Sequence, residues 1–132
     1  SLVTFTFSPD GKHFADMASE SNKYFIILDG KEGKKYDNVD LLTFSPDSQH
    51  FAYVAHEGNK DFVVLDGKKG KKYDWIDHLT FSPNSQHLAY EAYINLTFGP
   101  PIAKHLAYKA EESNKICVVL DGKEGKKYDD VY

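Results

Sequence analysis

The chain has 132 residues, a formal net charge of -4, sixteen lysines and no arginine, which suits one small domain. Nucleic-acid binders usually present an arginine-rich basic surface, so this balance argues against nucleic acid as a partner. No apolar run approaches the length of about 18 residues that a membrane span needs, and a single cysteine excludes an internal disulfide.

The sequence repeats itself every 37 residues. The segment Thr-Phe-Ser-Pro at 6–9 returns at 43–46 and at 80–83. A second segment, Leu-Asp-Gly-Lys, begins at Leu28 and again at Leu65. Such self-similarity at a fixed period is typical of repeat architectures.

The third copy of the second segment begins at Leu120, 55 residues after Leu65 rather than 37. The extra 18 residues have a visible cause, because His-Leu-Ala-Tyr at 87–90 recurs at 105–108. The third unit therefore has its first half and then restarts as a fourth. We expect a single repeat domain over 1–132, with units at about 1–38, 39–75, a half unit at 76–93, and 94–132.

Each full unit predicts four short strands. In the second unit an apolar first strand leads into Ser-Pro-Asp-Ser, which is typical of a type I turn. The pair Asp66-Gly67 after the third strand is a strong hairpin signal. No stretch keeps a 3.6-residue apolar period beyond one turn, so the fold is predicted to be all-β. The strands of this unit are expected at 41–44, 50–55, 61–65 and 71–76.

Four short strands in a unit of about 40 residues favour the blades of a β-propeller. One four-stranded sheet cannot bury both faces alone, whereas stacked sheets cover each other. The continuous apolar runs at 62–65 and 116–120 fit strands that are covered on both faces. We predict a β-propeller-like fold of four-stranded antiparallel blades, with about three and a half repeats per chain.

The segment Phe-Ser-Pro-Asp-Gly-Lys-His-Phe-Ala at 7–15, with its copies, resembles the repeat of TolB-type, WD-like bacterial β-propellers. The resemblance covers nearly the whole chain, because every unit contains the segment. It implies the blade fold and says almost nothing about a ligand. The chain departs from the family pattern in its number of units and in its missing half unit.

The number of repeats predicts self-association. Propellers close with about four to eight blades, so this chain would leave two blade faces uncovered and two strand edges free. The chain begins with a first strand and ends where the next first strand would follow, so one copy could continue another. We predict a homo-oligomer, with a dimer of seven blades' worth of strands favoured. The alternative is a fragment of a longer propeller protein.

Four histidines, His13, His50, His87 and His105, occupy the same position at the start of the second strand. Zinc needs its ligands around one point, whereas these residues belong to separate units. We expect a turn-stabilising role and predict no metal site.

The hairpin segment repeats carboxylates and lysines just as strictly. Paired carboxylates can perform acid–base chemistry in glycosidases, and a ring of lysines could attract an anionic partner. Repetition in every unit favours instead a structural role for the acids, through bonds to their own backbone, and solvated turns for the lysines. The acids are Asp29, Asp66, Asp121, Asp37, Asp74 and Asp129, and the lysines are Lys31, Lys34, Lys35, Lys68, Lys69, Lys71, Lys72, Lys123, Lys126 and Lys127.

Residues that break the repeat are the better candidates for ligand contact, with neutral surface drift as the alternative. First strands line the central channel of propellers generally. His78 and Asn95 stand in such strands, at the position where other units carry Thr4 and Leu41. The candidates are His78, Asn95, Asp16, Met17, Trp75 and His56.

The sequence contains no G-x-S-x-G elbow, phosphate loop, H-E-x-x-H or paired C-x-x-C, so we assign no catalytic residue and no cofactor. Cys117 lies in an apolar run and is expected to be a buried, inert thiol. We predict a non-catalytic binding or scaffold module for a protein or small polar ligand. A hydrolase- or lyase-type propeller enzyme, with residues from several blades, is the alternative. No leader-like segment is visible, and no compartment is predicted.

Overall fold

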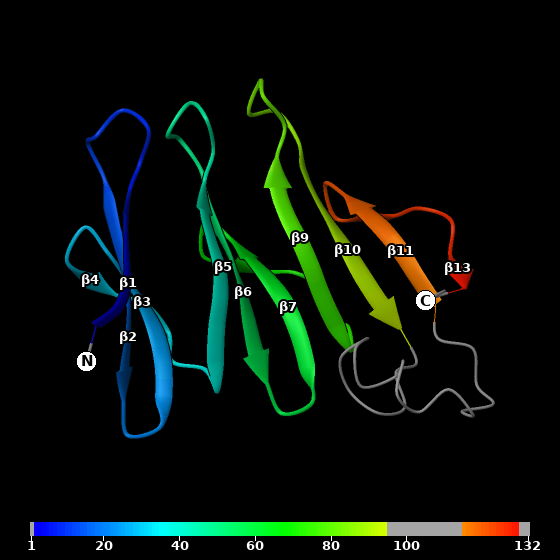
Figure 1. The fold of residues 1–132 in the computed structure, drawn as a ribbon, viewed down its shortest axis with the longest axis horizontal. Coiled ribbons are helices and arrows are strands. Elements are labelled where there is room, and N and C mark those ends of the chain that lie inside the picture. Colours follow the sequence, from blue (N-terminus) through cyan, green and yellow to red (C-terminus); the bar gives the residue numbers. More distant parts are fainter. Residues whose placement is uncertain (1, 95–114, 130–132) are drawn as a thin grey trace.

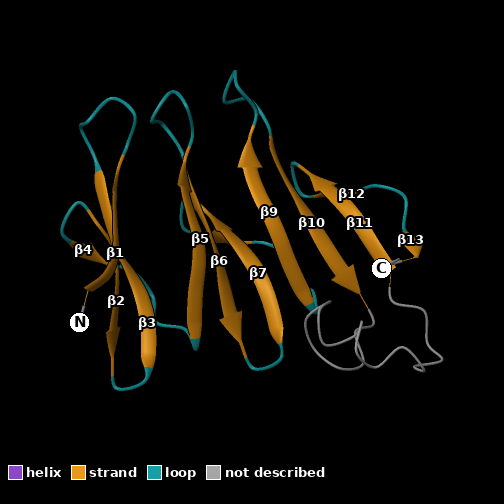
Figure 2. Cartoon of the chain, in the orientation of Figure 1, coloured by secondary structure: helices purple, strands orange, loops and turns teal. Residues whose placement is uncertain are grey.

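The computed structural model of the protein describes residues 2–94 and 115–129. These residues form three antiparallel sheets that stand side by side, with the strand Leu2–Phe7 toward one end of the row and the strand Tyr128–Asp129 toward the other (Figure 1). Strands joined by turns make up this part of the chain, as Figure 2 shows. It contains no helix long and apolar enough to cross a membrane.

We number the sheets as blades, in chain order. Blade 1 contains β1 (Leu2–Phe7), β2 (Phe14–Glu20), β3 (Lys23–Leu28) and β4 (Lys31–Glu32). Blade 2 contains β5 (Asn38–Phe44), β6 (Phe51–Glu57), β7 (Lys60–Leu65) and β8 (Lys68–Lys69). Blade 3 contains β9 (Trp75–Phe81), β10 (Leu88–Ile94), β11 (Lys115–Leu120), β12 (Lys123–Glu124) and β13 (Tyr128–Asp129).

The turn chemistry of the sequence explains the meander order of each blade. In blade 2 the Ser48 amide donates to the Ser45 carbonyl at 2.9 Å, which closes the predicted turn between β5 and β6. Between β7 and β8, Asp66 and Gly67 both have positive φ, 49° and 84°, as a two-residue hairpin turn requires. The predicted all-β fold and these turns are confirmed.

The fourth strand was expected at 71–76, and this expectation is wrong. The fourth strand is β8, at Lys68–Lys69, and Trp75–Ile76 already belong to β9 of the next blade. After β8 the Gly70 amide donates to the Val63 carbonyl at 2.7 Å. Tyr73 then forms an isolated bridge with Asp61, so the chain is held to β7 without a continuous fourth strand.

The duplicated half unit does not prevent a complete third sheet. The first half of the third repeat supplies β9 and β10, and the second half of the fourth repeat supplies β11 and β12. Ala89 pairs with Leu120 just as Ala52 pairs with Leu65 in blade 2, so the register is the one that the repeat dictates. The first half of the fourth repeat lies outside the described residues, apart from its junction with β10.

The two hydrophobic cores lie between blades rather than inside them. Ala15, Ile26 and Tyr36 of blade 1 pack with Phe51 and Phe62 of blade 2 in the first core. The second core joins blades 2 and 3, and its members are Ala52, Val54, Val63, Tyr73, Ile76, Leu88, Tyr90, Ala92, Cys117 and Val119. Each inner sheet face is therefore buried by its neighbour, as propeller packing requires.

Candidate functional site

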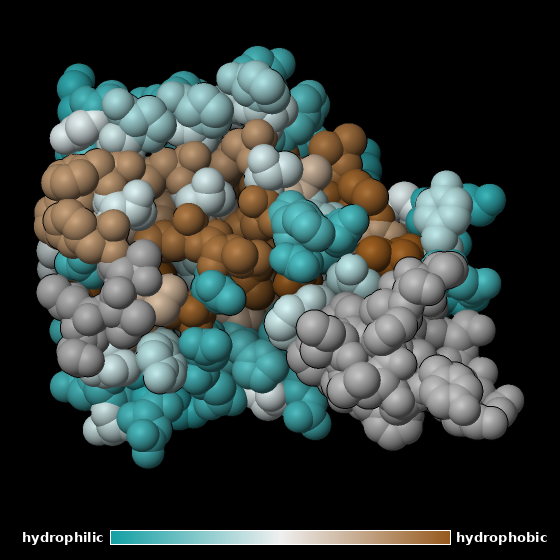
Figure 3. Space-filling model, in the orientation of Figure 1, coloured by the Kyte–Doolittle hydropathy of each residue, from teal (hydrophilic) through white to brown (hydrophobic). Residues whose placement is uncertain are grey.

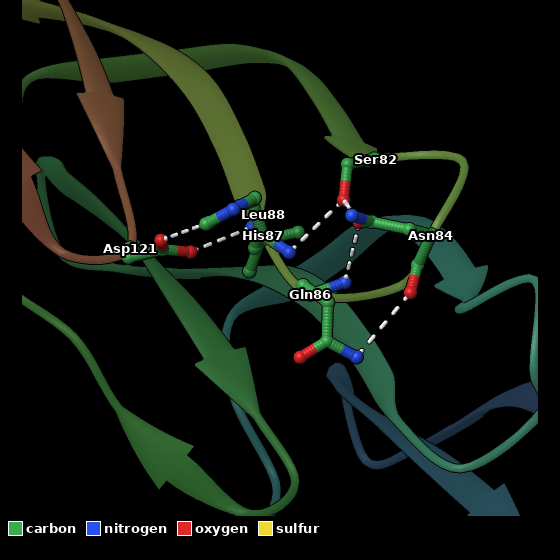
Figure 4. Close-up of polar contacts among 6 residues, drawn as sticks. All are labelled: Ser82, Asn84, Gln86, His87, Leu88 and Asp121. Atoms are coloured by element: carbon green, nitrogen blue, oxygen red, sulfur yellow. Dashed lines mark hydrogen bonds and ion pairs between the residues drawn. The ribbon is translucent and has the colours of Figure 1, made fainter.

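The repeated histidines tie turns to hairpins. In blade 3 the Nδ1 atom of His87 lies 2.6 Å from Oδ2 of Asp121, whose other oxygen accepts from the Leu88 amide (Figure 4). His13 with Asp29 and His50 with Asp66 make the same contact at 2.7 Å in blades 1 and 2. The turn-stabilising role is thus confirmed for these three histidines, while His105 lies outside the described residues.

The hairpin aspartates do not make the bonds to their own backbone that the sequence predicted. Asp29, Asp66 and Asp121 do not bond their own backbone; they reach the histidine and the amide at the start of the second strand. The hydrogen bonds from Phe14 and then His13 hold the pKa of Asp29 below its usual value. The second set of acids each pairs with a lysine of its own blade, in the pairs Lys23–Asp37, Lys60–Asp74 and Lys115–Asp129.

The turns between the first and second strands also link one blade to the next. The Asp10 amide of blade 1 donates to Oγ of Ser48 at 3.0 Å, and the Asp47 amide of blade 2 donates to Oγ of Ser85 at 2.9 Å. The residue that corresponds to these serines in blade 1 is Gly11, which has no hydroxyl. Blade 1 therefore cannot accept this bond from a preceding blade.

Two of the residues that break the repeat lie together in a cavity of about 300 Å³ between blades 2 and 3. His56 of β6 and Trp75 of β9 both line it, beside Asp61 of β7. Asp61 is a residue that sequence reasoning missed, although its counterparts in the other units are Tyr24 and Ile116. A charged residue in an otherwise apolar strand was the signal that could have revealed it.

Asp61 is the most unusual titratable group of this cavity. Its side chain is buried, accepts from the Ile76 amide at 3.1 Å and contacts Nδ1 of His56. Burial raises the pKa of the Asp61 carboxyl despite these partners. A buried carboxylate in contact with a histidine is an arrangement that can orient an imidazole or exchange a proton with it.

The first strands supply the rest of the polar lining. Asp40 and Asp77 occupy the same position in β5 and β9 and both face the cavity. Each accepts at 2.8 Å from the amide of the next residue, Leu41 or His78, whose φ lies in the left-handed region at 54° or 57°. The carboxylates thus hold a strained bend in both strands and give the cavity an acidic rim.

The other unrepeated candidates do not join this cavity. His78 pairs with Glu91 at 2.6 Å, and this hydrogen bond, with the nearby Asp77 charge, raises its pKa. Met17 packs against the first core. Asp16 is buried on β2, and its Oδ1 atom has no hydrogen-bond partner among the residues that the structure describes. Asn95 lies outside the described residues. Within those residues, no group of three or more histidines, cysteines or acids could hold a metal ion.

Several repeated side chains behave as structural groups. Lys69 lies over the rings of Tyr36 and Phe62, with its Nζ atom at 5.6 and 5.5 Å from their centres, so this lysine covers the boundary of blades 1 and 2. Cys117 is buried in the second core, and burial raises its pKa, as expected for an inert thiol.

The two outer blades expose the apolar faces that blade 2 buries. Val118 and Tyr128 of blade 3 are 55% and 58% exposed, whereas their blade 2 counterparts, Val63 and Tyr73, are each 3% exposed. At the opposite end Phe5 and Phe7 of β1 are each 57% exposed. In Figure 3 the hydrophobic band reaches the end of the molecule where blade 1 stands.

We name these surfaces by their ends. The amino face is the outer side of blade 1, with Phe5 and Phe7. The carboxyl face is the outer side of blade 3, with Val118, Leu120 and Tyr128. Among the described residues, the large hydrophobic side chains that are exposed all lie on these two faces, and none lies on blade 2.

Comparison with known proteins supports the fold. No family model matches the sequence, and no curated protein matches it. The chain is similar to the β-propeller domain of the Trilobed protease from Pyrococcus furiosus, with 15% identity and a TM-score of 0.65 over 98% of this chain and 43% of that one. It is also similar to Pyrococcus horikoshii acylaminoacyl peptidase, with 13% identity and a TM-score of 0.52 over 89% of this chain and 23% of that one.

The chain spans less than half the length of both structures. Their fold and the three antiparallel sheets together identify the protein as a partial β-propeller.

Proposed function

We propose that the protein is a non-catalytic propeller-like binding or scaffold module that completes its fold by self-association. The observation that carries this proposal is the exposure of the amino face and the carboxyl face, whose counterparts are buried or partly buried wherever a neighbouring blade is present. Contiguous apolar surface of this kind is typical of interaction sites in folded proteins. We also assign the repeat to the TolB-type, WD-like class, because the Ser-Pro-Asp/Asn turn recurs in every blade.

The cavity between blades 2 and 3 supports the binding role. It combines one buried carboxylate, Asp61, with a histidine and the only tryptophan of the chain, Trp75. A mixed polar and aromatic lining suits a small polar ligand. Because Trp75 is the only tryptophan, its fluorescence reports directly on occupation of the cavity.

The same cavity favours one second candidate, a hydrolase-type activity that uses the Asp61–His56 pair. The raised pKa of Asp61 is the observation behind it, because catalytic acids and bases often have shifted pKa values. Turnover of chromogenic ester or peptide substrates that Asp61→Asn abolishes would support this candidate. Absence of turnover in the wild type would leave the binding role.

A charge placed on the carboxyl face tests self-association. We expect Val118→Lys to reduce the solution mass to that of one chain, 15.0 kDa, because a lysine would be desolvated by any partner that covers this face. Gln49→Lys adds the same charge on an exposed turn of blade 2 and should leave the mass unchanged. Light scattering after size exclusion measures both. A wild type that already elutes as a single chain contradicts the proposal.

A further inference from the structure

Building on the self-association proposed above, we propose that the carboxyl face of one copy docks head-to-tail on the amino face of a second copy. The contact continues the blade-to-blade packing that the chain already uses twice. The partner is therefore another copy of this chain, and the junction is a third instance of the same interface.

The apolar side chains of the two faces match an interface that exists within the chain. Val118, Leu120 and Tyr128 stand where Val63, Leu65 and Tyr73 of blade 2 meet blade 3. On the other side, Phe5 and Phe7 stand where Leu79 and Phe81 of blade 3 pack against that same core. Each face thus carries the side chains that the other needs as its neighbour.

The charges of the two faces are also complementary. Between blades 2 and 3, Glu124 accepts from the Tyr73 hydroxyl at 2.7 Å and from Lys71 Nζ at 2.6 Å. The residues that correspond to Tyr73 and Lys71 on the carboxyl face are Tyr128 and Lys126, and the residue that corresponds to Glu124 on the amino face is the exposed Glu32. A head-to-tail junction therefore places Tyr128 and Lys126 against Glu32.

The boundary between blades 1 and 2 carries a different pair of charges. Between blades 1 and 2, the position of Glu124 is taken by Lys69, which faces Lys34 across the boundary. The junction between copies thus repeats the favourable tyrosine–glutamate–lysine contact of blades 2 and 3 and not the lysine–lysine contact of blades 1 and 2. Charge complementarity favours a second copy over an unrelated apolar partner.

A buried carboxylate of the amino face gains a polar neighbour in the same arrangement. Asp16, whose Oδ1 atom has no partner within the described part of the chain, occupies the position of Tyr90, and the Tyr90 ring lies 6.3 Å from that of Tyr73. At the junction the ring that takes the place of Tyr73 is Tyr128, which carries a hydroxyl donor. The one hydroxyl donor of Tyr128 is already assigned to Glu32, so at the junction its ring packs beside Asp16 as the Tyr73 ring packs beside Tyr90.

Repeated head-to-tail contacts form a closed ring when the rotation per copy permits, and an open filament otherwise. Two copies bring six of the described blades together, since each contributes three sheets, and this number lies within the range of about four to eight at which propellers close. Two copies also approach the length of the Pyrococcus furiosus propeller domain, of which one copy spans 43%. A ring of two copies is the arrangement that we expect.

Charge reversal on the two faces tests the junction. In Glu32→Lys each junction brings the introduced lysine against Lys126, and in Lys126→Glu it brings two glutamates together, so we expect each variant alone to weaken self-association at least about tenfold. Mixing the two variants allows rings in which both junctions pair opposite charges. Native mass spectrometry of the mixture, with one variant isotopically labelled, should show mixed two-chain particles in excess of either homogeneous particle.

The controls separate this inference from the proposed function. Lys71→Glu makes the matched reversal inside the chain, between blades 2 and 3, and should lower the melting temperature without favouring mixed particles. If both face variants associate like the wild type and mix at random, the head-to-tail junction is wrong while self-association stands. If the wild type itself is a single chain, both proposals fail.

A second variant strengthens the junction and does not depend on a charge. Gly11 has a φ of 74° and open space around its missing Cβ, and the corresponding serines have φ values of 63° and 61°. Asn84 corresponds to Asp10 and Asp47, whose amides donate to a serine hydroxyl of the next blade. At the junction the next blade carries Gly11, so Gly11→Ser supplies a hydroxyl acceptor for the Asn84 amide of the partner copy. We expect a dissociation constant about fivefold lower, from one added hydrogen bond. An unchanged or higher constant in folded protein would overturn this placement of the two turns.

Discussion

At the scale of single residues, Asp61 is the clearest departure from the repeat. Tyrosine and isoleucine occupy its position in the other two blades, so the fold does not need a carboxylate there. The buried charge is offset by the Ile76 amide and by His56, but burial still raises the pKa of Asp61. A group that is retained at a cost in stability is a reasonable candidate for ligand binding.

Replacement of Asp61 by asparagine should therefore stabilise the protein at neutral pH. A raised pKa means that the folded state binds the proton more tightly than the unfolded state, so the ionised carboxylate lowers stability as the pH rises. Asp61→Asn keeps an acceptor for the Ile76 amide and removes the charge. We expect an increase of about 1 kcal/mol in the unfolding free energy at pH 7 and almost none below pH of about 4.

Chemical unfolding at the two pH values measures this difference. Asp40→Asn, on the exposed rim of the same cavity, is the matched control: the Asp40 charge is the weakest of the causes that raise the pKa of Asp61, so its removal should stabilise the protein much less at pH 7. A loss of stability in Asp61→Asn at pH 7 would show that the ionised Asp61–His56 pair is a net stabilising contact.

Glu124 shows the opposite behaviour. Hydrogen bonds from Lys71 and then Tyr73 lower its pKa from 4.5 to about 2. Its contribution to stability is fully present above the unfolded pKa of 4.5 and is lost as the pH falls through the folded value near 2. Glu124→Gln should therefore have a lower melting temperature than wild type at pH 6. As the pH falls from about 5 to about 2, the melting temperature of the variant should decrease less steeply than that of the wild type.

Thermal melts across this pH range test the assignment. Glu57→Gln removes a carboxylate from β6 without touching that contact and should leave the slope of the wild type. Equal slopes in wild type and Glu124→Gln would mean that the contact between blades 2 and 3 does not form in solution.

At the scale of elements, the blades are joined by serine hydroxyls as well as by apolar contacts. Ser85 has a φ of 61°, accepts from the Asp47 amide and is buried. Ser85→Ala should cost about 1 kcal/mol, because it leaves that amide without its partner while keeping the strained backbone. Ser85→Gly also loses the hydroxyl but relieves the backbone, so it should fall between wild type and alanine. Urea unfolding should give this order, and an alanine variant as stable as wild type would contradict it.

The elements were predictable where their chemistry is local. The Ser-Pro-Asp-Ser turn and the Asp66-Gly67 hairpin carry their conformations in their own residues, and both form where expected. The fourth strand was misplaced because Gly70 turns the chain toward the Val63 carbonyl, which is a contact with another strand. The pairing of β10 with β11 was not predictable either, because the duplication offers β11 two equivalent partner segments in sequence.

The candidate site was predictable only in part, for a similar reason. His56 and Trp75 stand out as breaks in the repeat, yet they lie in different units, and only the packing of blades 2 and 3 brings them to one cavity. Asp61 was overlooked within an apolar strand that reads as core. The exposed faces follow from the number of units, but the proposed pairing of Glu32 with Lys126 of a second copy could be inferred only from the contact of Glu124 with Lys71 and Tyr73.

At the scale of the whole molecule, the described chain is a set of three blades whose two outer faces both expose large apolar side chains. The buried cores between blades show how such faces pack, and the Lys71–Glu124 contact between blades 2 and 3 is the basis on which we propose a second copy as the neighbour. In the proposed assembly, a second copy completes the fold in the way that an additional blade would.

The mass of the wild-type protein in solution is the most direct test of this central claim. Sedimentation velocity over a concentration series from nanomolar to micromolar should show a transition from 15.0 kDa toward twice that mass, with the limiting species at two chains. A single-chain mass at every concentration, in protein whose circular dichroism shows folded β-structure, would contradict the claim and leave the two faces to be covered by something other than a second copy.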